Sequence, residues 1–214
     1  RNAVVSGVTL TNMYDQSSDS VIGAGVSVVN GTLVNSRIVG LKTSNYYLDL
    51  ENGLVQNCEV CNCTGSYYNN PPGVVLVAGG ICDGLKVHHN TSDYCPGVAI
   101  KGGELRNAAI YANVMNKEQS TRNCAGIYAT GGKVWNCTVY GNVVKGENLK
   151  PSGLAVDGTV TIKNCIFWRN YAEGATGGSV SIGAGKDFSH NVNDIELANY
   201  PDTITDDPCL MNPD

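Results

Sequence analysis

Residues 126–142 read GIYATGGKVWNCTVYGN, and this stretch recurs in altered form along the chain. Two further copies are clear, residues 97–113 (GVAIKGGELRNAAIYAN) and residues 153–170 (GLAVDGTVTIKNCIFWRN). Each copy opens with Gly, alternates apolar and polar residues in two runs, and carries one Asn between the runs and another at the end. With weaker copies on both sides, the chain shows a repeat of about 25 residues, which is typical of a solenoid.

Alternation with a period of two is the pattern of β-strands. When the copies are aligned, the same inward position holds a small or branched aliphatic side chain in every copy. One such column reads Val26, Leu48, Val75, Val98, Ile127, Leu154 and Val180. Stacking of like side chains in successive coils predicts an all-β fold, a single-stranded parallel β-helix of about seven to eight coils. We expect this domain over residues 1–200 and a C-terminal tail over residues 201–214 that packs on the last coil or leaves it.

Two columns of Asn accompany the strands. The first contains Asn35, Asn57, Asn107, Asn136 and Asn164, with Gly84 and Ser189 in the two other coils. The second contains Asn90, Asn113, Asn142 and Asn170. Asn tolerates the left-handed backbone of tight turns, and its amide can bond the same amide in the next coil. Both columns are therefore interpreted as structural.

Composition excludes several classes of protein. The chain has 214 residues, of which 42% are hydrophobic, and this content argues against disorder. The net charge of −5, without basic clusters, argues against nucleic acid as the main partner. No apolar run approaches the ~18 residues of a membrane span, so none is expected.

The coil ends NCTVYGN (136–142) and NCIFWRN (164–170) resemble secreted bacterial β-helix proteins of the pectin-lyase-like superfamily. The closing segment DDPCLMNP (206–213) is similar to the region that precedes a choice-of-anchor Q type C-terminus. This resemblance implies a right-handed helix, export, and a location outside the cell or on its outer surface. It also suggests an excised domain or mature fragment, whose terminal strands could associate end to end.

Nine cysteines allow one disulfide hypothesis. Cys95 and Cys124 both lie two residues before a Gly that opens a coil, so they are expected in adjacent coils about 5 Å apart, within the range of a disulfide. Cys137 and Cys165 also occupy adjacent coils, but they are expected to point inward as reduced thiols.

Enzymes of the resembling superfamily degrade acidic polysaccharides. The sequence lacks the motifs of polygalacturonases, but Asp49 and Glu51 share an outward face of one strand, and Lys101 lies two coils away. A two-carboxylate mechanism or a lysine base would need such groups, so Asp49, Glu51 and Lys101 are weak catalytic candidates.

A more regular outward row contains His88, Tyr111, Tyr140 and Trp168, preceded by Val39 and Cys61 and followed by Asn193. Arg106, Trp135 and Lys163 are expected beside it. Stacked rings can simply cover an exposed sheet, or they can offer a platform to sugar rings or to a protein partner. Tyr46, Tyr47, Tyr67 and Tyr68 form a second aromatic candidate.

No metal site is predicted. His88 and His89 are neighbours and should point to opposite faces of a strand, while His190 lies several coils away. A surface calcium ion at the acidic segments 15–19 or 202–207 is the one cofactor that the sequence leaves open.

Two functions therefore remain. The first is a non-catalytic extracellular or cell-surface β-helix module that contacts polysaccharide, cell-surface glycan or other surface proteins. The alternative is a polysaccharide lyase or glycoside hydrolase acting on an acidic polysaccharide.

Overall fold

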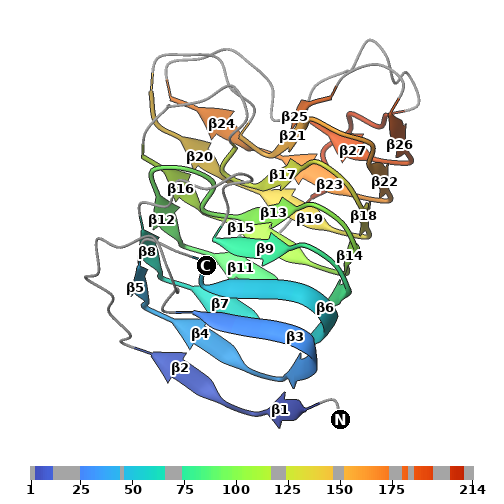
Figure 1. Ribbon diagram of the computed structural model, residues 1–214. Coiled ribbons are helices and arrows are strands. Elements are labelled where there is room, and N and C mark those ends of the chain that lie inside the picture. Colours follow the sequence, from blue (N-terminus) through green and yellow to red (C-terminus); the bar gives the residue numbers. More distant parts are fainter. Residues whose placement is uncertain are drawn as a thin grey trace.

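In a computed structural model the chain winds into a parallel β-helix, with β1 and β2 at one end of the stack and β25 to β27 at the other (Figure 1). The structure describes residues 3–11, 25–43, 46–65, 74–116, 124–146, 152–173, 180–182, 186–194 and 203–209. These residues form β-strands and turns, with no helix among them. The prediction of an all-β parallel β-helix is confirmed.

Three sheets form the sides of the solenoid. The first has 13 strands: β1 (Val4–Ser6), β3 (Val26–Val34), β6 (Leu48–Gln56), β9 (Val75–Val77), β10 (Ile81–Asp83), β13 (Val98–Ile100), β14 (Glu104–Arg106), β17 (Ile127–Ala129), β18 (Lys133–Trp135), β21 (Leu154–Val156), β22 (Thr161–Lys163), β25 (Val180–Ser181) and β26 (Asp187–Ser189). The second has eight: β2 (Thr9–Thr11), β4 (Arg37–Val39), β7 (Glu59–Cys61), β11 (Lys86–His88), β15 (Ala109–Tyr111), β19 (Thr138–Tyr140), β23 (Ile166–Trp168) and β27 (Val192–Asn193). The third has six: β5 (Lys42–Thr43), β8 (Thr64–Gly65), β12 (Thr91–Ser92), β16 (Val114–Met115), β20 (Val143–Val144) and β24 (Tyr171–Ala172).

The 13-stranded sheet consists of two limbs that meet in the long strands β3 and β6. Later coils contribute one short strand to each limb. We call the series β9, β13, β17, β21 and β25 the first limb, and the series β10, β14, β18, β22 and β26 the second limb. Six coils contribute to every side, fewer than the expected seven to eight, because the first and last coils have no described strand in the six-stranded sheet.

The core is a set of stacked columns inside the coils. Val98 lies opposite Ile127, and Ile127 opposite Leu154, as the alignment predicted. All three side chains are fully buried. Branched aliphatic side chains repeat there because each coil buries the same face of the same strand.

Close stacking also explains the Gly that opens several coils. A Cβ atom on Gly97 would lie 1.9 Å from the carbonyl oxygen of Gly126, and one on Gly126 would lie 2.2 Å from that of Gly153. Adjacent backbones therefore approach more closely here than any side chain allows.

Left-handed residues turn the chain from the second limb into the eight-stranded sheet. Asn107, Asn136 and Asn164 have φ of 53°, 51° and 55°. In the last coil His190 takes this position, with φ of 55°, so the assignment of Ser189 to it is wrong. Ser189 pairs with Lys163 at the end of the strand instead.

A hydrogen bond from the residue after this turn explains why Cys often follows the turn Asn. The thiol of Cys137 donates to the carbonyl oxygen of Trp135 at 3.1 Å, and that of Cys165 to Lys163 at 3.2 Å. Ser36 makes the same bond to Val34 at 2.8 Å. A short inward donor at this position therefore satisfies a carbonyl group next to the turn.

The second Asn column forms a continuous ladder of buried amides. The Nδ2 atom of each Asn donates to Oδ1 of the Asn in the next coil, at 3.1 Å from Asn90 to Asn113, 2.9 Å from Asn113 to Asn142 and 2.8 Å from Asn142 to Asn170. All four side chains are buried. We call Asn90, Asn113, Asn142 and Asn170 the amide ladder.

The described part of the C-terminal segment pairs with the last coil. Ile204 forms a parallel bridge to Val192, and the backbone N–H of Asn193 donates to the carbonyl of Ile204 at 2.9 Å. This contact extends the stack by one further bridge.

Candidate functional site

The eight-stranded sheet carries a row of ring side chains on its outer face. Strand pairing places His88 opposite Tyr111, Tyr111 opposite Tyr140, and Tyr140 opposite Trp168. The four residues therefore occupy one position in four successive coils. We call His88, Tyr111, Tyr140 and Trp168 the ring row.

The members of the ring row are all half-buried. The imidazole of His88 stacks on the ring of Tyr111, with centroids 4.6 Å apart and planes inclined by 7°. The Nη1 atom of Arg169 donates to the hydroxyl of Tyr140 at 3.5 Å. The rings of His88 and Tyr111 therefore pack face to face, and all four side chains of the row remain partly exposed to a ligand on the outer face.

The ring row ends earlier than the alignment predicted. Asn193 lies opposite Phe167 and is fully buried, so its expected place after Trp168 on the outer face is wrong. The physical reason is the turn at His190, which shifts the last coil by one residue relative to the aligned copies.

Arg106, Trp135 and Lys163 also form a row, but on the second limb of the 13-stranded sheet. A left-handed turn at Asn107, Asn136 or Asn164 separates each of them from the ring row. Their charges are paired locally, Arg106 with Asp83 at 3.0 Å and Glu104 at 3.2 Å, and Lys163 with Asp187 at 3.1 Å. This second row is thus an ion-paired surface on another side of the solenoid.

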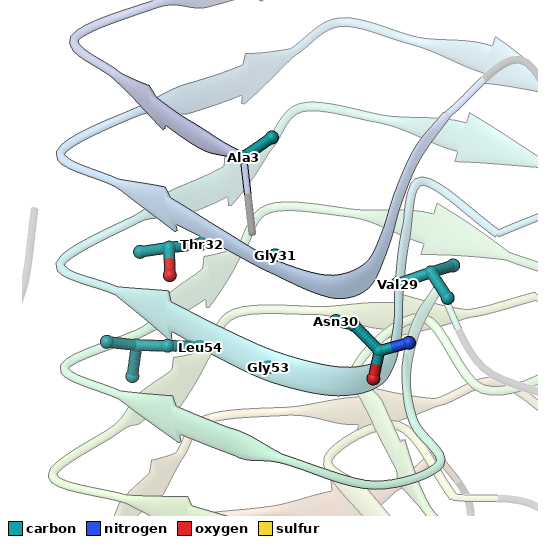
Figure 2. Close-up of a pocket in the computed structure, with 7 residues that line it drawn as sticks. All are labelled: Ala3, Val29, Asn30, Gly31, Thr32, Gly53 and Leu54. Carbon is teal, nitrogen blue, oxygen red and sulfur yellow. The ribbon is translucent and has the colours of Figure 1, made fainter. Parts of the chain in front are cut away.

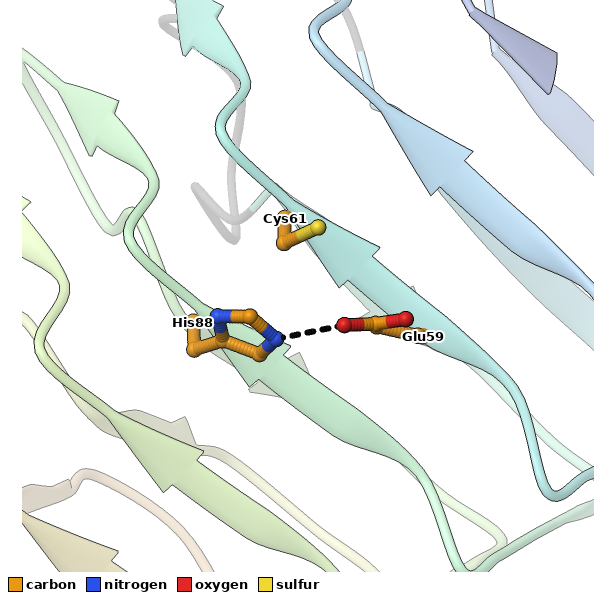
Figure 3. Close-up of side chains that lie close together, drawn as sticks. All are labelled: Glu59, Cys61 and His88. Carbon is orange, nitrogen blue, oxygen red and sulfur yellow. Dashed lines mark hydrogen bonds and ion pairs between the residues drawn. The ribbon is translucent and has the colours of Figure 1, made fainter. Parts of the chain in front are cut away.

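A cluster of three functional side chains lies at the start of the ring row (Figure 3). One potential ligand atom from each of Glu59, Cys61 and His88 lies within 4.8 Å of the other two. Nε2 of His88 is 2.8 Å from Oε1 of Glu59. We call these residues the Glu59–Cys61–His88 cluster.

Neighbouring charges set the ionisation of this cluster. The guanidinium of Arg37 bonds Oε2 of Glu59 and lowers the pKa of that carboxyl group, to which His88 also contributes. Burial lowers the pKa of His88, although Glu59 opposes this shift. Burial and the charge of Glu59 raise the pKa of the Cys61 thiol. At neutral pH the cluster therefore contains a carboxylate, a neutral imidazole and a protonated thiol.

The expectation that His88 and His89 point to opposite faces is wrong. Strand β11 ends at His88, and His89 adopts a left-handed conformation with φ of 53°, so the alternation of a strand does not reach it. The two Nδ1 atoms lie 2.8 Å apart.

Sequence reasoning missed Glu59. The signal was present, because Glu59 and Cys61 are separated by one residue on a strand and Cys61 aligns with His88 in the next coil. Glu59 lies 29 residues before His88, and only the coil register brings the two side chains together.

The weak catalytic candidates lie near the start of the first limb. Burial, followed by the charge of Glu51, raises the pKa of Asp49, while the charge of Lys101 lowers it. Along the row of Asp49, however, Leu76 is 6% exposed and Ala99 is fully buried. The described outward positions therefore do not form an open catalytic face there.

A pocket near the β1 end of the solenoid is lined by Ala3, Val29, Asn30, Gly31, Thr32, Gly53 and Leu54 (Figure 2). None of these residues has an ionisable side chain. The pocket therefore offers backbone polar groups, the amide of Asn30 and the hydroxyl of Thr32, but no ionisable side chain for acid–base catalysis.

All nine cysteines are free thiols in this structure. Cys95 and Cys124 are buried together, and burial, followed by a hydrogen bond with Cys95, raises the pKa of Cys124. Their proximity is compatible with the disulfide hypothesis, which stays a prediction. Burial raises the pKa of Cys82 to about 12, so this interior thiol is unreactive.

Of the second aromatic candidate, the structure describes Tyr46, which is half-buried, and Tyr47. Tyr47 is only 1% exposed and belongs to the core. Tyr67 and Tyr68, and the acidic segment 15–19, lie outside the described residues. Asp206 and Asp207 are exposed.

Comparison with models of protein families, with curated proteins and with solved structures finds no match for this chain. Within the described residues, no helix has the length and apolar character needed to cross a membrane. Function must therefore be argued from the geometry of the outer faces.

Proposed function

We propose that this chain is a non-catalytic polysaccharide-binding module that acts outside the cell, where extended glycans occur. The ring row is its binding surface. The observation that supports the proposal best is the register of the eight-stranded sheet, which repeats one half-exposed ring per coil at Tyr111, Tyr140 and Trp168. At about 4.8 Å per coil, a linear polymer can contact successive rings with the same chemistry.

The surroundings of the ring row favour this use. Ala109 and Thr138 occupy the outward positions two residues before Tyr111 and Tyr140, and these small side chains flank the rings on the same face. At Tyr111 and Tyr140 a sugar ring can therefore approach without displacing a larger neighbour, whereas Ile166 flanks Trp168. Aromatic pairs contribute about 0.5–1.5 kcal/mol, and we expect a sugar face stacked on one ring to contribute a similar amount.

The charge beside the ring row favours an acidic polymer. Lys86 and Arg169 are exposed next to it. The carboxylate of Glu59 at its start is already paired with Arg37. The face is therefore locally cationic although the whole chain has a net charge of −5.

Binding to a panel of soluble uronic-acid and neutral polysaccharides, measured by affinity electrophoresis and calorimetry, tests the proposal. Tyr140→Ala and Trp168→Ala should each weaken binding about 3–10-fold, the equivalent of one stacked ring. Tyr171→Ala is the matched control, because Tyr171 is 51% exposed on the six-stranded sheet. Equal losses in all three variants would contradict a role for the ring row.

The alternative is a lyase or hydrolase at Asp49, Glu51 and Lys101, and the raised pKa of Asp49 is the observation in its favour. Release of reducing ends or unsaturated products from the same polymers, abolished by Lys101→Ala, would establish it. We expect no release, because the described residues that continue the row of Asp49 are covered.

A further inference from the structure

We propose that the Glu59–Cys61–His88 cluster binds one divalent transition-metal ion of the zinc class. The proposal rests on the position of the three ligand atoms, which all lie within 4.8 Å of one another. It goes beyond polysaccharide binding and does not depend on it.

Two adjacent strands fix the three ligands. Glu59 and Cys61 project from the same face of β7, separated by one residue, and His88 lies directly opposite Cys61 on β11 (Figure 3). Both strands pair on each side within the eight-stranded sheet. The backbone of the site is therefore rigid, as a metal site requires.

The ligand atoms select the class of metal. A thiolate, an imidazole nitrogen and a carboxylate oxygen together suit Zn²⁺ or Co²⁺ rather than Ca²⁺ or Mg²⁺, which prefer oxygen alone. Bonds of about 2.0–2.3 Å place tetrahedral ligands roughly 3.3–3.7 Å apart. Side-chain rotations that move the ligand atoms by about 1 Å would shorten their present separations of up to 4.8 Å to this range.

Each ligand has a second partner that orients it. Arg37 bonds Oε2 of Glu59, which leaves Oε1 toward His88. Nδ1 of His88 lies 2.8 Å from Nδ1 of His89, so Nδ1–H of His88 can donate a hydrogen bond to Nδ1 of His89 when Nε2 binds a metal. Nδ2 of Asn62 lies 3.8 Å from Sγ of Cys61. Such outer partners hold metal ligands in the orientation that binding needs.

Three protein ligands leave the fourth tetrahedral position for water or another oxygen donor. Cys61 forms the base of the site, at 1% exposure, whereas the side chains of His88 and Glu59 are 12% and 24% exposed. An ion would therefore enter from the outer face, beside Tyr111, and exchange of the fourth ligand would take place there.

Titration of the reduced chain with Co²⁺, followed by absorption spectroscopy, tests the site because a thiolate–cobalt bond gives a charge-transfer band. We expect one ion per chain and displacement by Zn²⁺. Cys61→Ser should abolish the band. Glu59→Gln and His88→Gln should each weaken cobalt binding by about 100-fold, because loss of a ligand should cost at least as much affinity as loss of a residue that only orients a ligand. Circular dichroism checks that each variant is folded.

Matched controls separate this site from other cysteines and histidines. Cys209→Ser changes an exposed thiol, and His190→Asn changes an exposed histidine to the residue found at the equivalent turn in other coils. Both should keep full cobalt binding. The proposal is overturned if the wild-type chain gives no thiolate band, if the band persists in folded Cys61→Ser, or if folded His88→Gln binds Co²⁺ as tightly as the wild-type chain. Because Glu59 and His88 lie at the surface, their variants decide the question even if Cys61→Ser does not fold.

Discussion

The amide ladder and the ring row belong to the same four coils, yet they obey different rules. Each Asn of the ladder follows a member of the ring row by two residues, as Asn113 follows Tyr111. Inside, the residue never changes over four coils, because Oδ1 and Nδ2 both have fixed buried partners. Outside, the residue varies among His, Tyr and Trp, because stacking requires only a ring.

This contrast separates structural from functional repetition. An inward amide must satisfy every neighbouring polar group, since water cannot replace a lost partner. An outward ring is in contact with water and needs no such set of buried partners, so its residue type can vary with the ligand that it contacts. Identical residues in a solenoid column therefore point to internal bonding, whereas residues alike only in shape point to a surface.

The largest effect is expected from Asn113→Ala. Asn113 accepts bonds from the backbone N–H and Nδ2 of Asn90 and donates to the carbonyl oxygen of Val87. At about 1–3 kcal/mol for each buried group left unpaired, the free energy of unfolding should fall by about 3–5 kcal/mol in urea denaturation. Tyr111→Ala, the control in the same coil, should cost about 1 kcal/mol. Similar losses in the two variants would remove the contrast.

An intermediate effect, of opposite sign, is expected from Cys63→Asn. Cys63 lies in the ladder column, its N–H already donates to Oδ1 of Asn90, and its thiol lies 4.0 Å from the carbonyl of Ile38. That carbonyl is equivalent to the one that Asn90 bonds at Val60. The new amide should extend the ladder and raise stability by about 0.5–1.5 kcal/mol.

Cys82→Asn is the control for Cys63→Asn. Cys82 is equally buried but lies in an aliphatic column between Val55 and Leu105, so an amide there should destabilise the fold strongly. Destabilisation by both variants would show that the ladder cannot be extended.

The smallest effect is expected at Asp49, whose side chain lies on the outward face of its strand but is half-buried. Its Oδ1 atom is buried with no hydrogen-bond partner among the residues that the structure describes, and its pKa is raised by burial. The folded state therefore holds this proton more tightly than the unfolded state, and stability should fall as pH rises from about 4 through the folded pKa. Asp49→Asn should remove this fall and increase stability at pH 7 by less than about 1 kcal/mol. Urea midpoints between pH 4 and pH 7 measure it, and Asp206→Asn, at an exposed carboxyl group in the C-terminal segment, is the control.

The architecture could be predicted from sequence because alternation and repetition act together. Columns such as Val98, Ile127 and Leu154 follow from period two within a coil and like residues between coils. The prediction failed where one residue shifts the alignment of a coil with its neighbours. His190 replaces Asn at a turn, and Asn193 moves inside as a result.

The candidate site was only half visible for a related reason. The ring row could be found by alignment, because its members share a position and a shape. The Glu59–Cys61–His88 cluster joins two positions of one strand with one position of the next coil, and its residues differ in type although Cys61 and His88 occupy one column. The left-handed backbone of His89 was also hidden, since His is not a typical turn residue.

The uniform register has a consequence for how such a protein can change in size. Each of the four coils that carry the amide ladder presents the same amide to the next, so one of these coils is interchangeable with its neighbour as a unit of growth. Duplication of a coil would add one more ring outside and one more amide inside, without redesign of the interior. The length of the outer surface can therefore be adjusted in steps of about 4.8 Å, by gene duplication or by design.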